Sequence, residues 1–171
     1  MKLKWLYLLA FSLFLSPVCF SQKFDFKENA VYILNLVKYT DWPSAKTEVS
    51  IGIVGTTNVE SELIALIAKK KNSKVTYSLK KIKPEEAKSV DVIIFSENSG
   101  KELGTIQPQI DKLPILVIAQ KEDQARLGAC ISLFIDEDDN FKTKYQLSLK
   151  NCKAKGLTIS EQIISNAVLV K

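Results

Sequence analysis

The chain has 171 residues, a mean hydropathy of +0.03 and a formal net charge of +5, and it contains no histidine. The lack of histidine excludes Ser-His-Asp and Cys-His catalysis, the usual histidine metal sites and the most common general base. Arg126 is the only arginine. Because nucleic-acid readers favour arginine for its bidentate contacts, we expect no nucleic-acid partner.

The first 21 residues have the layout of a secretory signal peptide. Two lysines precede an uncharged apolar run over residues 5–15, and Pro17 and small residues follow it. The run is much shorter than the ~20 residues of a membrane-spanning helix. We therefore expect cleavage between Ser21 and Gln22 and export of residues 22–171 as a single domain, with an uncleaved N-terminal anchor as the alternative.

Apolar residues at helical spacing predict an opening helix over residues 28–39. One of its faces is aliphatic, and a nearly opposite face carries Tyr32, Leu36 and Tyr39. A helix that is apolar on two sides is either deeply buried or packed against a partner. Pro43 ends the helix, and Trp42 beside it is either a core residue or a binding anchor.

Strands and helices alternate over the middle of the chain. β-branched and continuous apolar runs predict strands over residues 49–54, 74–79, 90–95 and 114–119. Helical patterns fall between them, over residues 57–70, from Pro84 onward and over residues 99–112. Thr57 and Glu60 have the spacing of a capping box. This alternation predicts an α/β fold with a mainly parallel sheet and helices on both faces.

The last third of the chain has a different pattern. Residues 130–135 and 141–147 predict a β-hairpin around an acidic loop, which lacks the glycine and glutamate of a calcium loop. A short helix over residues 149–154 ends at a left-handed Gly156. A terminal helix then begins near Ser160 and carries Ile163, Ile164 and Val168.

Cys130 and Cys152 remain after removal of the leader. An even pair of cysteines in an oxidising compartment can form a disulfide. The bridge would close a loop of 22 residues and contribute ~3 kcal/mol. Two buried free thiols are the equal alternative, because spacing does not reveal geometry.

The residues assemble no catalytic constellation. Ser78 and Lys81 have the spacing of a serine–lysine pair, but they lie at the end of a strand rather than at a helix start. The glycines after the first strand lack the remaining residues of a dinucleotide or phosphate loop. We expect neither enzyme activity, nor a cofactor, nor a metal site.

Three segments resemble the YfiR-like family of periplasmic proteins. The opening helix runs into Trp42-Pro43 as the family's first helix does, and residues 51–55 match its first strand, which runs into a glycine. The most specific match is the closing pattern, which residues 145–149 and 156–160 follow in register. The resemblance covers essentially the whole mature chain, although serines replace the family's asparagines in the last two strands.

The resemblance implies a non-enzymatic periplasmic regulator, often dimeric, with helices around one sheet. It implies repression of a membrane diguanylate cyclase through that enzyme's periplasmic sensor region, with a sensor histidine kinase as an equal alternative partner. Release by an envelope signal would be a population shift. The candidate contact residues form two surfaces, which are Tyr32, Leu36, Tyr39 and Trp42 on the first and Gly156, Leu157 and Ile159 on the second. For the second surface, closure of the core is the alternative.

A second hypothesis is a periplasmic binding module for a small ligand or a cell-wall fragment. A parallel sheet offers a crevice at the carboxyl ends of its strands. Polar residues follow three of the predicted strands, at positions 55–57, 96–98 and 120. These side chains suit either a ligand site or ordinary loops.

Overall fold

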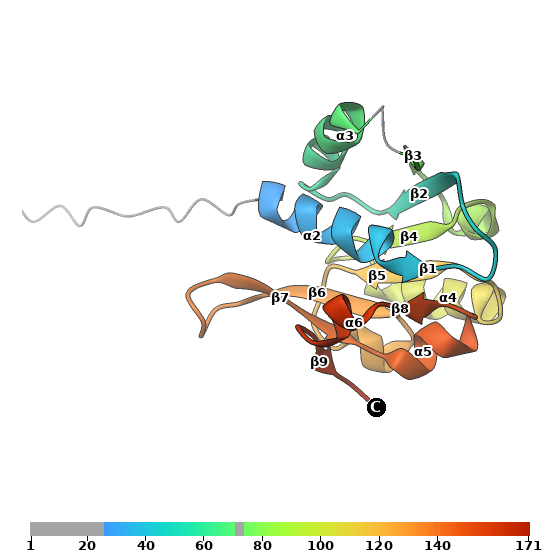
Figure 1. The fold of residues 1–171 in the computed structure, drawn as a ribbon. Helices are drawn as coiled ribbons and strands as arrows, with labels where there is room; N and C mark the ends of the chain where they lie inside the picture. Colours follow the sequence, from blue (N-terminus) through green and yellow to red (C-terminus); the bar gives the residue numbers. More distant parts are fainter. Residues whose placement is uncertain (1–25, 71–73) are drawn as a thin grey trace, which may run out of the picture.

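A seven-stranded sheet forms the centre of the computed structural model, which describes residues 26–70 and 74–171 (Figure 1). The strand order is β3-β2-β4-β5-β6-β7-β9. The first five strands in this order are parallel, whereas β7 is antiparallel to β6 and β9 is parallel to β7. The strands are β2 (Glu48–Val54), β3 (Thr76–Lys81), β4 (Val92–Phe95), β5 (Leu116–Ala119), β6 (Ile131–Asp136), β7 (Lys142–Leu147) and β9 (Val168–Leu169). The predicted α/β fold with a mainly parallel sheet is confirmed.

Burial along the strands follows their position in the sheet. β4 and β5 are continuous runs of four apolar residues, and they are buried along their whole length. This is the pattern of parallel strands that helices cover on both faces. β3 lies at the edge of the sheet and exposes Lys80 and Lys81, whose charges oppose pairing with another chain.

Helices cover both faces of the sheet (Figure 1). The helical segments are α2 (Phe26–Lys38), α3 (Glu60–Lys69), η1 (Pro84–Ser89), α4 (Gly100–Ile110), η2 (Gln124–Leu127), α5 (Leu149–Ala154) and α6 (Glu161–Ile164). The chain adds β3 on one side of β2 and then returns to add β4 on the other side. Because crossovers between parallel strands are right-handed, this reversal puts α3 and α4 on opposite faces. α2 contacts α3, and α4 contacts η1.

The opening helix α2 is buried on both of its apolar faces. Leu36, which belongs to the second face, is only 1% exposed and lies in the core. Tyr32 and Tyr39 on the same face are half-buried and pack against the core with their rings. The interpretation of Leu36 as a contact residue is therefore corrected, because its side chain is enclosed within the domain.

A second, two-stranded sheet joins the end of α2 to the closing segment of the chain. β1 (Thr40–Asp41) pairs antiparallel with β8 (Thr158–Ile159), with Thr40 opposite Ile159. Gly156 precedes this pair with a φ of +71°, as the prediction of a left-handed cap requires. Leu157 and Ile159 are buried, so this turn closes the core and does not present an apolar surface.

The C-terminal segment differs from the predicted long helix. α6 ends at Ile164, and Val168 lies in strand β9 opposite Gln146 of β7. Without β9, this side of β7 would leave backbone donors and acceptors unpaired, and the return of the chain supplies them with partners. Val170 extends the pairing by donating its N–H to the carbonyl of Leu147 at 3.0 Å.

The predicted capping box at the start of α3 is also not formed. The Thr57 hydroxyl accepts a hydrogen bond from the N–H of Val59 at 3.2 Å, which makes a local turn before the helix. α3 begins at Glu60, whose carboxylate instead pairs with Lys81 at 3.0 Å. The turn and this ion pair orient the loop that follows β2.

The acidic loop of the β6–β7 hairpin is neutralised by lysines of the same hairpin. Lys144 pairs with Asp136 at 2.7 Å and with Asp139 at 3.0 Å, and Lys142 also pairs with Asp139 at 3.0 Å. Hydrogen bonds from Lys144 hold the pKa of both aspartates below the usual value. Among the described residues, no group of acidic or sulfur ligands is arranged to hold a metal ion.

Candidate functional site

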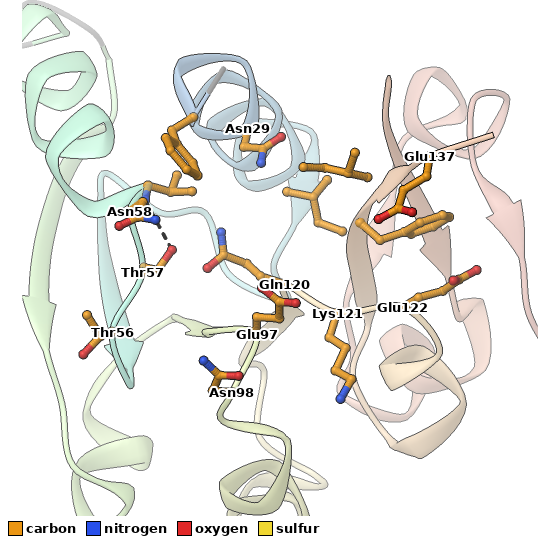
Figure 2. A pocket seen from close by; sticks show the side chains of 15 residues that line it. Asn29, Thr56, Thr57, Asn58, Glu97, Asn98, Gln120, Lys121, Glu122 and Glu137 are labelled. Carbon is orange, nitrogen blue, oxygen red and sulfur yellow. Dashed lines mark hydrogen bonds between the residues drawn. The ribbon is translucent and has the colours of Figure 1, made fainter. Parts of the chain in front are cut away.

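A cavity of about 500 Å³ opens at the carboxyl ends of β2, β4 and β5, and we call it the strand-end cleft (Figure 2). It includes polar residues from all three loops that were predicted to meet there. Segments that are remote in sequence, the start of α2 and strand β6, supply the opposite wall. The lining residues are Phe26, Asn29, Thr56, Thr57, Asn58, Val59, Glu97, Asn98, Gln120, Lys121, Glu122, Leu133, Phe134, Ile135 and Glu137.

Topology explains why the cleft forms at this place. β3 and β4 lie on opposite sides of β2, so the loops after β2 and β4 lead to helices on opposite faces. These loops separate and leave a crevice, which is where ligands of open α/β sheets bind. The strand-end cleft therefore occupies the topological switch point of this sheet.

Gly55 and two serines form a tightly packed turn at the base of the loops. Gly55 has a φ of +87°, and a Cβ at this position would collide with the hydroxyls of Ser96 and Ser99. The two hydroxyls are 2.6 Å apart, and Ser99 also donates to the carbonyl of Val54 at 3.1 Å. This packing holds the loop after β2 against the loop after β4.

The polar side of the cleft is rich in amide and hydroxyl groups. Figure 2 shows Gln120 and Glu97 close together in the middle of the cleft, with Asn98 next to Glu97 and with Asn58 on the loop before α3. The side-chain oxygen of Gln120 is buried, yet it has no hydrogen-bond partner among the described residues. A buried acceptor without a partner costs free energy unless water or a ligand satisfies it.

The opposite wall is apolar and was not predicted from the sequence. Phe26 of α2 and residues Leu133 to Ile135 of β6 supply it, and Asn29 lies at its edge. The apolar side chains of β6 were interpreted only as core. Their alternation along the hairpin gives no signal that the far end of the strand faces a cavity.

A second cavity of about 420 Å³ lies between α2, β7 and α6, and we call it the aromatic groove. It contains three of the predicted contact residues, although Leu36 contributes only buried atoms. Its lining residues are Tyr32, Asn35, Leu36, Tyr39, Thr143, Lys144, Tyr145, Gln162, Ile163 and Asn166. The second apolar face that was predicted for the opening helix thus forms one wall of the aromatic groove.

Tyrosines of α2 and β7 are held in fixed positions in the aromatic groove. The rings of Tyr32 and Tyr145 have centroids 6.3 Å apart at a tilt of 58°, which is a favourable aromatic arrangement. The Tyr145 hydroxyl donates to the carbonyl of Ile163 at 2.8 Å. Burial raises the pKa of Tyr145, and the nearby Tyr32 adds to this shift. At the other end of the groove, the ammonium of Lys38 lies 4.7 Å from the ring centre of Tyr39.

The other predicted contact residues lie apart from the aromatic groove. The indole N–H of Trp42 donates to the carbonyl of Pro114 at 2.9 Å, and the ring packs against the core. A Cβ at Gly156 would lie 3.2 Å from the ring of Pro43, so the predicted second surface packs against the end of the first. Trp42 and Gly156 therefore belong to a structural junction between the opening and closing segments.

Cys130 and Cys152 are buried thiols that contact each other. The hydrogen bond between them lowers the pKa of Cys130 and raises that of Cys152. Lys155 is also buried close to this pair, and its ammonium donates to the carbonyl of Ile110 at 3.1 Å. Burial lowers the pKa of Lys155. The burial of this lysine was not predicted from the sequence, because lysines are rarely buried.

The predicted leader and its cleavage point between Ser21 and Gln22 lie outside the described residues. Within residues 26–70 and 74–171, no helix is both long enough and apolar enough to cross a membrane.

Several solved structures share the fold of this chain at low sequence identity. An ABC domain in complex with L-Trp from Streptococcus pneumoniae superposes with a TM-score of 0.57 at 14% identity, covering 85% of this chain and 60% of that one. A conserved domain protein from Vibrio cholerae gives 0.52 at 14% identity, covering 86% and 60%. A substrate binding protein with adhesive properties from Clostridium difficile gives 0.52 at 17% identity, covering 81% and 58%. The chain thus spans about 60% of the length of these structures, which share its fold.

No curated protein gives a significant match to the sequence. A family model described as YfiR/HmsC-like matches residues 27–168, which include all the helices and strands described above except the first residue of α2 and the last residue of β9. The match agrees with the resemblance carried by the opening helix and the closing pattern. The chain belongs to the YfiR/HmsC-like family of periplasmic regulatory proteins.

Proposed function

We propose that the protein represses a membrane signalling protein by binding its periplasmic sensor region. The partner is a diguanylate cyclase or a sensor histidine kinase, and the repressor itself needs neither a catalytic group nor a cofactor. This proposal includes removal of the leader after Ser21 and export of residues 22–171 as one domain. The observation that carries it is the aromatic groove, where half-buried tyrosines line an open cavity.

The aromatic groove has the chemistry of a protein-binding surface. Tyr32 lies on α2, Tyr39 directly follows the last residue of this helix, and both line the same groove. Tyrosine is enriched at the centres of interfaces, because it buries a large area and keeps a polar tip. The tilted contact of Tyr32 with Tyr145 fixes its ring before binding, which reduces the entropy lost on association.

The mechanism is a population shift in the receptor. The repressor binds the inactive state of the sensor region more tightly than the active state, and it thereby holds the output domain inactive. An envelope signal that weakens this binding releases the receptor. The repressor can shift the receptor's equilibrium between active and inactive states only by the difference between its binding free energies for these two states. A ligand with equal affinity for both states would shift nothing.

A site-specific crosslink in intact cells tests the proposal. A photoreactive phenylalanine analogue at position 39 is expected to capture one inner-membrane receptor with a cytoplasmic signalling domain. The same analogue at Tyr77, a half-buried tyrosine on the edge strand β3, is the matched control and is expected to capture none. Capture of only a second copy from position 39 contradicts the receptor proposal and identifies the groove as a homodimer contact.

A functional variant separates binding from folding. Tyr39→Ala is expected to weaken receptor binding by about tenfold or more, which is typical of an anchor residue, and to raise the receptor's output. Tyr77→Ala is expected to leave the output unchanged. If Tyr39→Ala lowers the melting temperature as a core truncation does and changes binding no more than Tyr77→Ala, the groove is structural.

A second function, binding of a small molecule, is favoured by the strand-end cleft. Its volume lies within the range of small-molecule sites, and its position is the switch point of the sheet. A thermal shift with small solutes and cell-wall fragments tests it, because a ligand raises the melting temperature by mass action.

A further inference from the structure

We propose that the strand-end cleft binds an uncharged saccharide. The sugar hydroxyls would contact the amides at the strand ends, and its C–H face would pack on the apolar wall from α2 and β6. This inference rests on the second function proposed above, and it names the class of ligand and the residues that select it. It is independent of receptor binding at the aromatic groove.

The hydrogen-bonding groups of the cleft match hydroxyl groups. Each sugar hydroxyl donates one hydrogen bond and accepts others, and a side-chain amide offers both functions as well. Asn58, Asn98 and Gln120 bring three amides to the polar side, and Thr56 adds a hydroxyl. The buried oxygen of Gln120 has no partner within residues 26–70 and 74–171, so it is free to accept from a ligand hydroxyl.

The apolar wall matches the C–H face of a sugar ring. Phe26 is 37% exposed at the start of α2, and Phe134 lies across the cleft on β6. Leu133 closes the wall between them with a side chain that is almost fully buried. A site with an apolar side and a few convergent polar groups is the usual composition of a small-molecule pocket.

The charges of the cleft disfavour anionic ligands. Glu97, Glu122 and Glu137 supply three carboxylates, whereas Lys121 supplies one ammonium. Figure 2 shows the Lys121 ammonium directed away from Gln120. A phosphate or a free carboxylate would meet a net negative site, whose carboxylates repel it. An uncharged ligand avoids this repulsion and uses the carboxylates as acceptors.

Calorimetric titration of the exported, purified protein tests the proposal. The probes are N,N′-diacetylchitobiose as the uncharged saccharide, N-acetylglucosamine 6-phosphate as its anionic counterpart, and putrescine as a cation. We expect saturable binding of the uncharged sugar, with the phosphorylated sugar at least about tenfold weaker. Binding of the phosphorylated sugar as tightly as the uncharged one overturns the charge argument and the proposal with it.

Two amide variants locate the binding. Gln120→Ala is expected to weaken binding of N,N′-diacetylchitobiose by about tenfold, since a hydrogen bond to a buried acceptor is lost. Gln162→Ala is the matched control, because this exposed glutamine lines the aromatic groove instead. Equal effects of the two variants place the sugar elsewhere and overturn the proposal.

The probes also separate this inference from the function on which it rests. If putrescine binds in a Gln120-dependent way and the sugar does not, the saccharide proposal is wrong while small-molecule binding stands. If none of the three probes binds, the saccharide proposal is wrong, and the thermal shift with small solutes decides whether small-molecule binding stands. Receptor capture from position 39 is measured separately and does not depend on either result.

Discussion

The hydroxyl of Thr143 donates a hydrogen bond of 2.6 Å to the side-chain oxygen of Asn29. Thr143 lines the aromatic groove, whereas Asn29 lines the strand-end cleft. The two residues are 114 positions apart in the sequence and connect β7 to the first turn of α2. This contact is therefore a direct link between the two candidate sites, and it involves a helix that borders both.

Removal of this link is the first test of its role. Thr143→Val keeps the shape of the side chain and leaves the part-buried side-chain oxygen of Asn29 without this donor. We expect the free energy of unfolding to fall by about 1 to 3 kcal/mol, measured by urea denaturation. Thr105→Val is the control, because that hydroxyl makes only an exposed contact of 3.4 Å within α4. An equal decrease in the free energy of unfolding of both variants would show that the Thr143 hydrogen bond contributes no more to stability than the exposed one of Thr105.

The second test concerns the turn at the base of the strand-end cleft. Gly55→Ala adds a Cβ at a φ of +87° and against two serine hydroxyls, so we expect a loss of more than about 1 kcal/mol in the free energy of unfolding. Gly104→Ala is the opposite control. That glycine lies inside α4 with open space around it, so alanine is expected to stabilise by about 0.5 to 1 kcal/mol. Thermal denaturation of both variants measures these opposite changes in stability. If the turn is free to rearrange, Gly55→Ala will not destabilise the protein.

The strands and their mainly parallel pairing were predictable because the buried runs are short, apolar and separated by helical patterns. Residues 92–95 and 116–119 show this plainly, since no polar residue interrupts either strand. The polar half of the strand-end cleft followed from the same logic, because the carboxyl ends of parallel strands meet at one edge. The sequence alone thus located positions 55–57, 96–98 and 120 at a common site.

The rest of both sites depends on tertiary contacts that no local pattern records. Leu36 lies on the face of α2 that also carries Tyr32, but its side chain is buried in the core. Val168 continues a helical pattern, yet it pairs with β7 because that strand offers unpaired backbone groups. Phe26 lines the strand-end cleft from the start of α2, a segment that is remote in sequence from the strand-end loops. Each of these outcomes is set by packing between segments that are remote in sequence.

The third prediction concerns pH. Asp91 is half-buried before β4, and its carboxylate accepts from Lys46 at 2.7 Å and from the N–H and hydroxyl of Ser50 at 2.8 and 2.7 Å. Burial raises the pKa of Asp91, but the hydrogen bonds from Lys46 and Ser50 outweigh it and hold the pKa below the usual value. A carboxyl whose pKa is lower in the folded state stabilises the fold above its unfolded pKa of about 4, and this stabilisation is lost as the pH falls through the folded pKa.

Asp91→Asn removes this titration. We expect the variant to be about 1 to 3 kcal/mol less stable than the parent at pH 7, and the difference to shrink steadily below about pH 4. Urea denaturation at several pH values measures both. Glu85→Gln replaces an exposed carboxyl on η1 and is expected to show no such dependence. A difference that stays constant down to pH 2 would mean that Asp91 acts through packing and not through its charge.

The fourth prediction concerns the buried thiols. Cys130 and Cys152 contact each other, and the hydrogen bond from Cys152 favours the thiolate of Cys130, which is the form that attacks a disulfide. Oxidised glutathione can accept the two electrons, so that one S–S bond forms in the protein and two molecules of reduced glutathione leave. We expect the oxidised protein to be more stable by up to about 3 kcal/mol, because the bridge restricts the unfolded chain.

The burial of both sulfurs makes the rate of this reaction informative. Neither thiol is accessible in the folded protein, so oxidation requires local or global opening and is expected to be slow in buffer and fast in mild urea. Mass spectrometry of alkylated protein counts the remaining thiols, and melting temperatures with and without dithiothreitol report the stabilisation. Cys152→Ala is the control, in which oxidant is expected to leave the melting temperature unchanged. If both cysteines of the parent stay fully alkylatable after oxidation in mild urea, the pair consists of two structural thiols, and the contact with Lys155 serves packing alone.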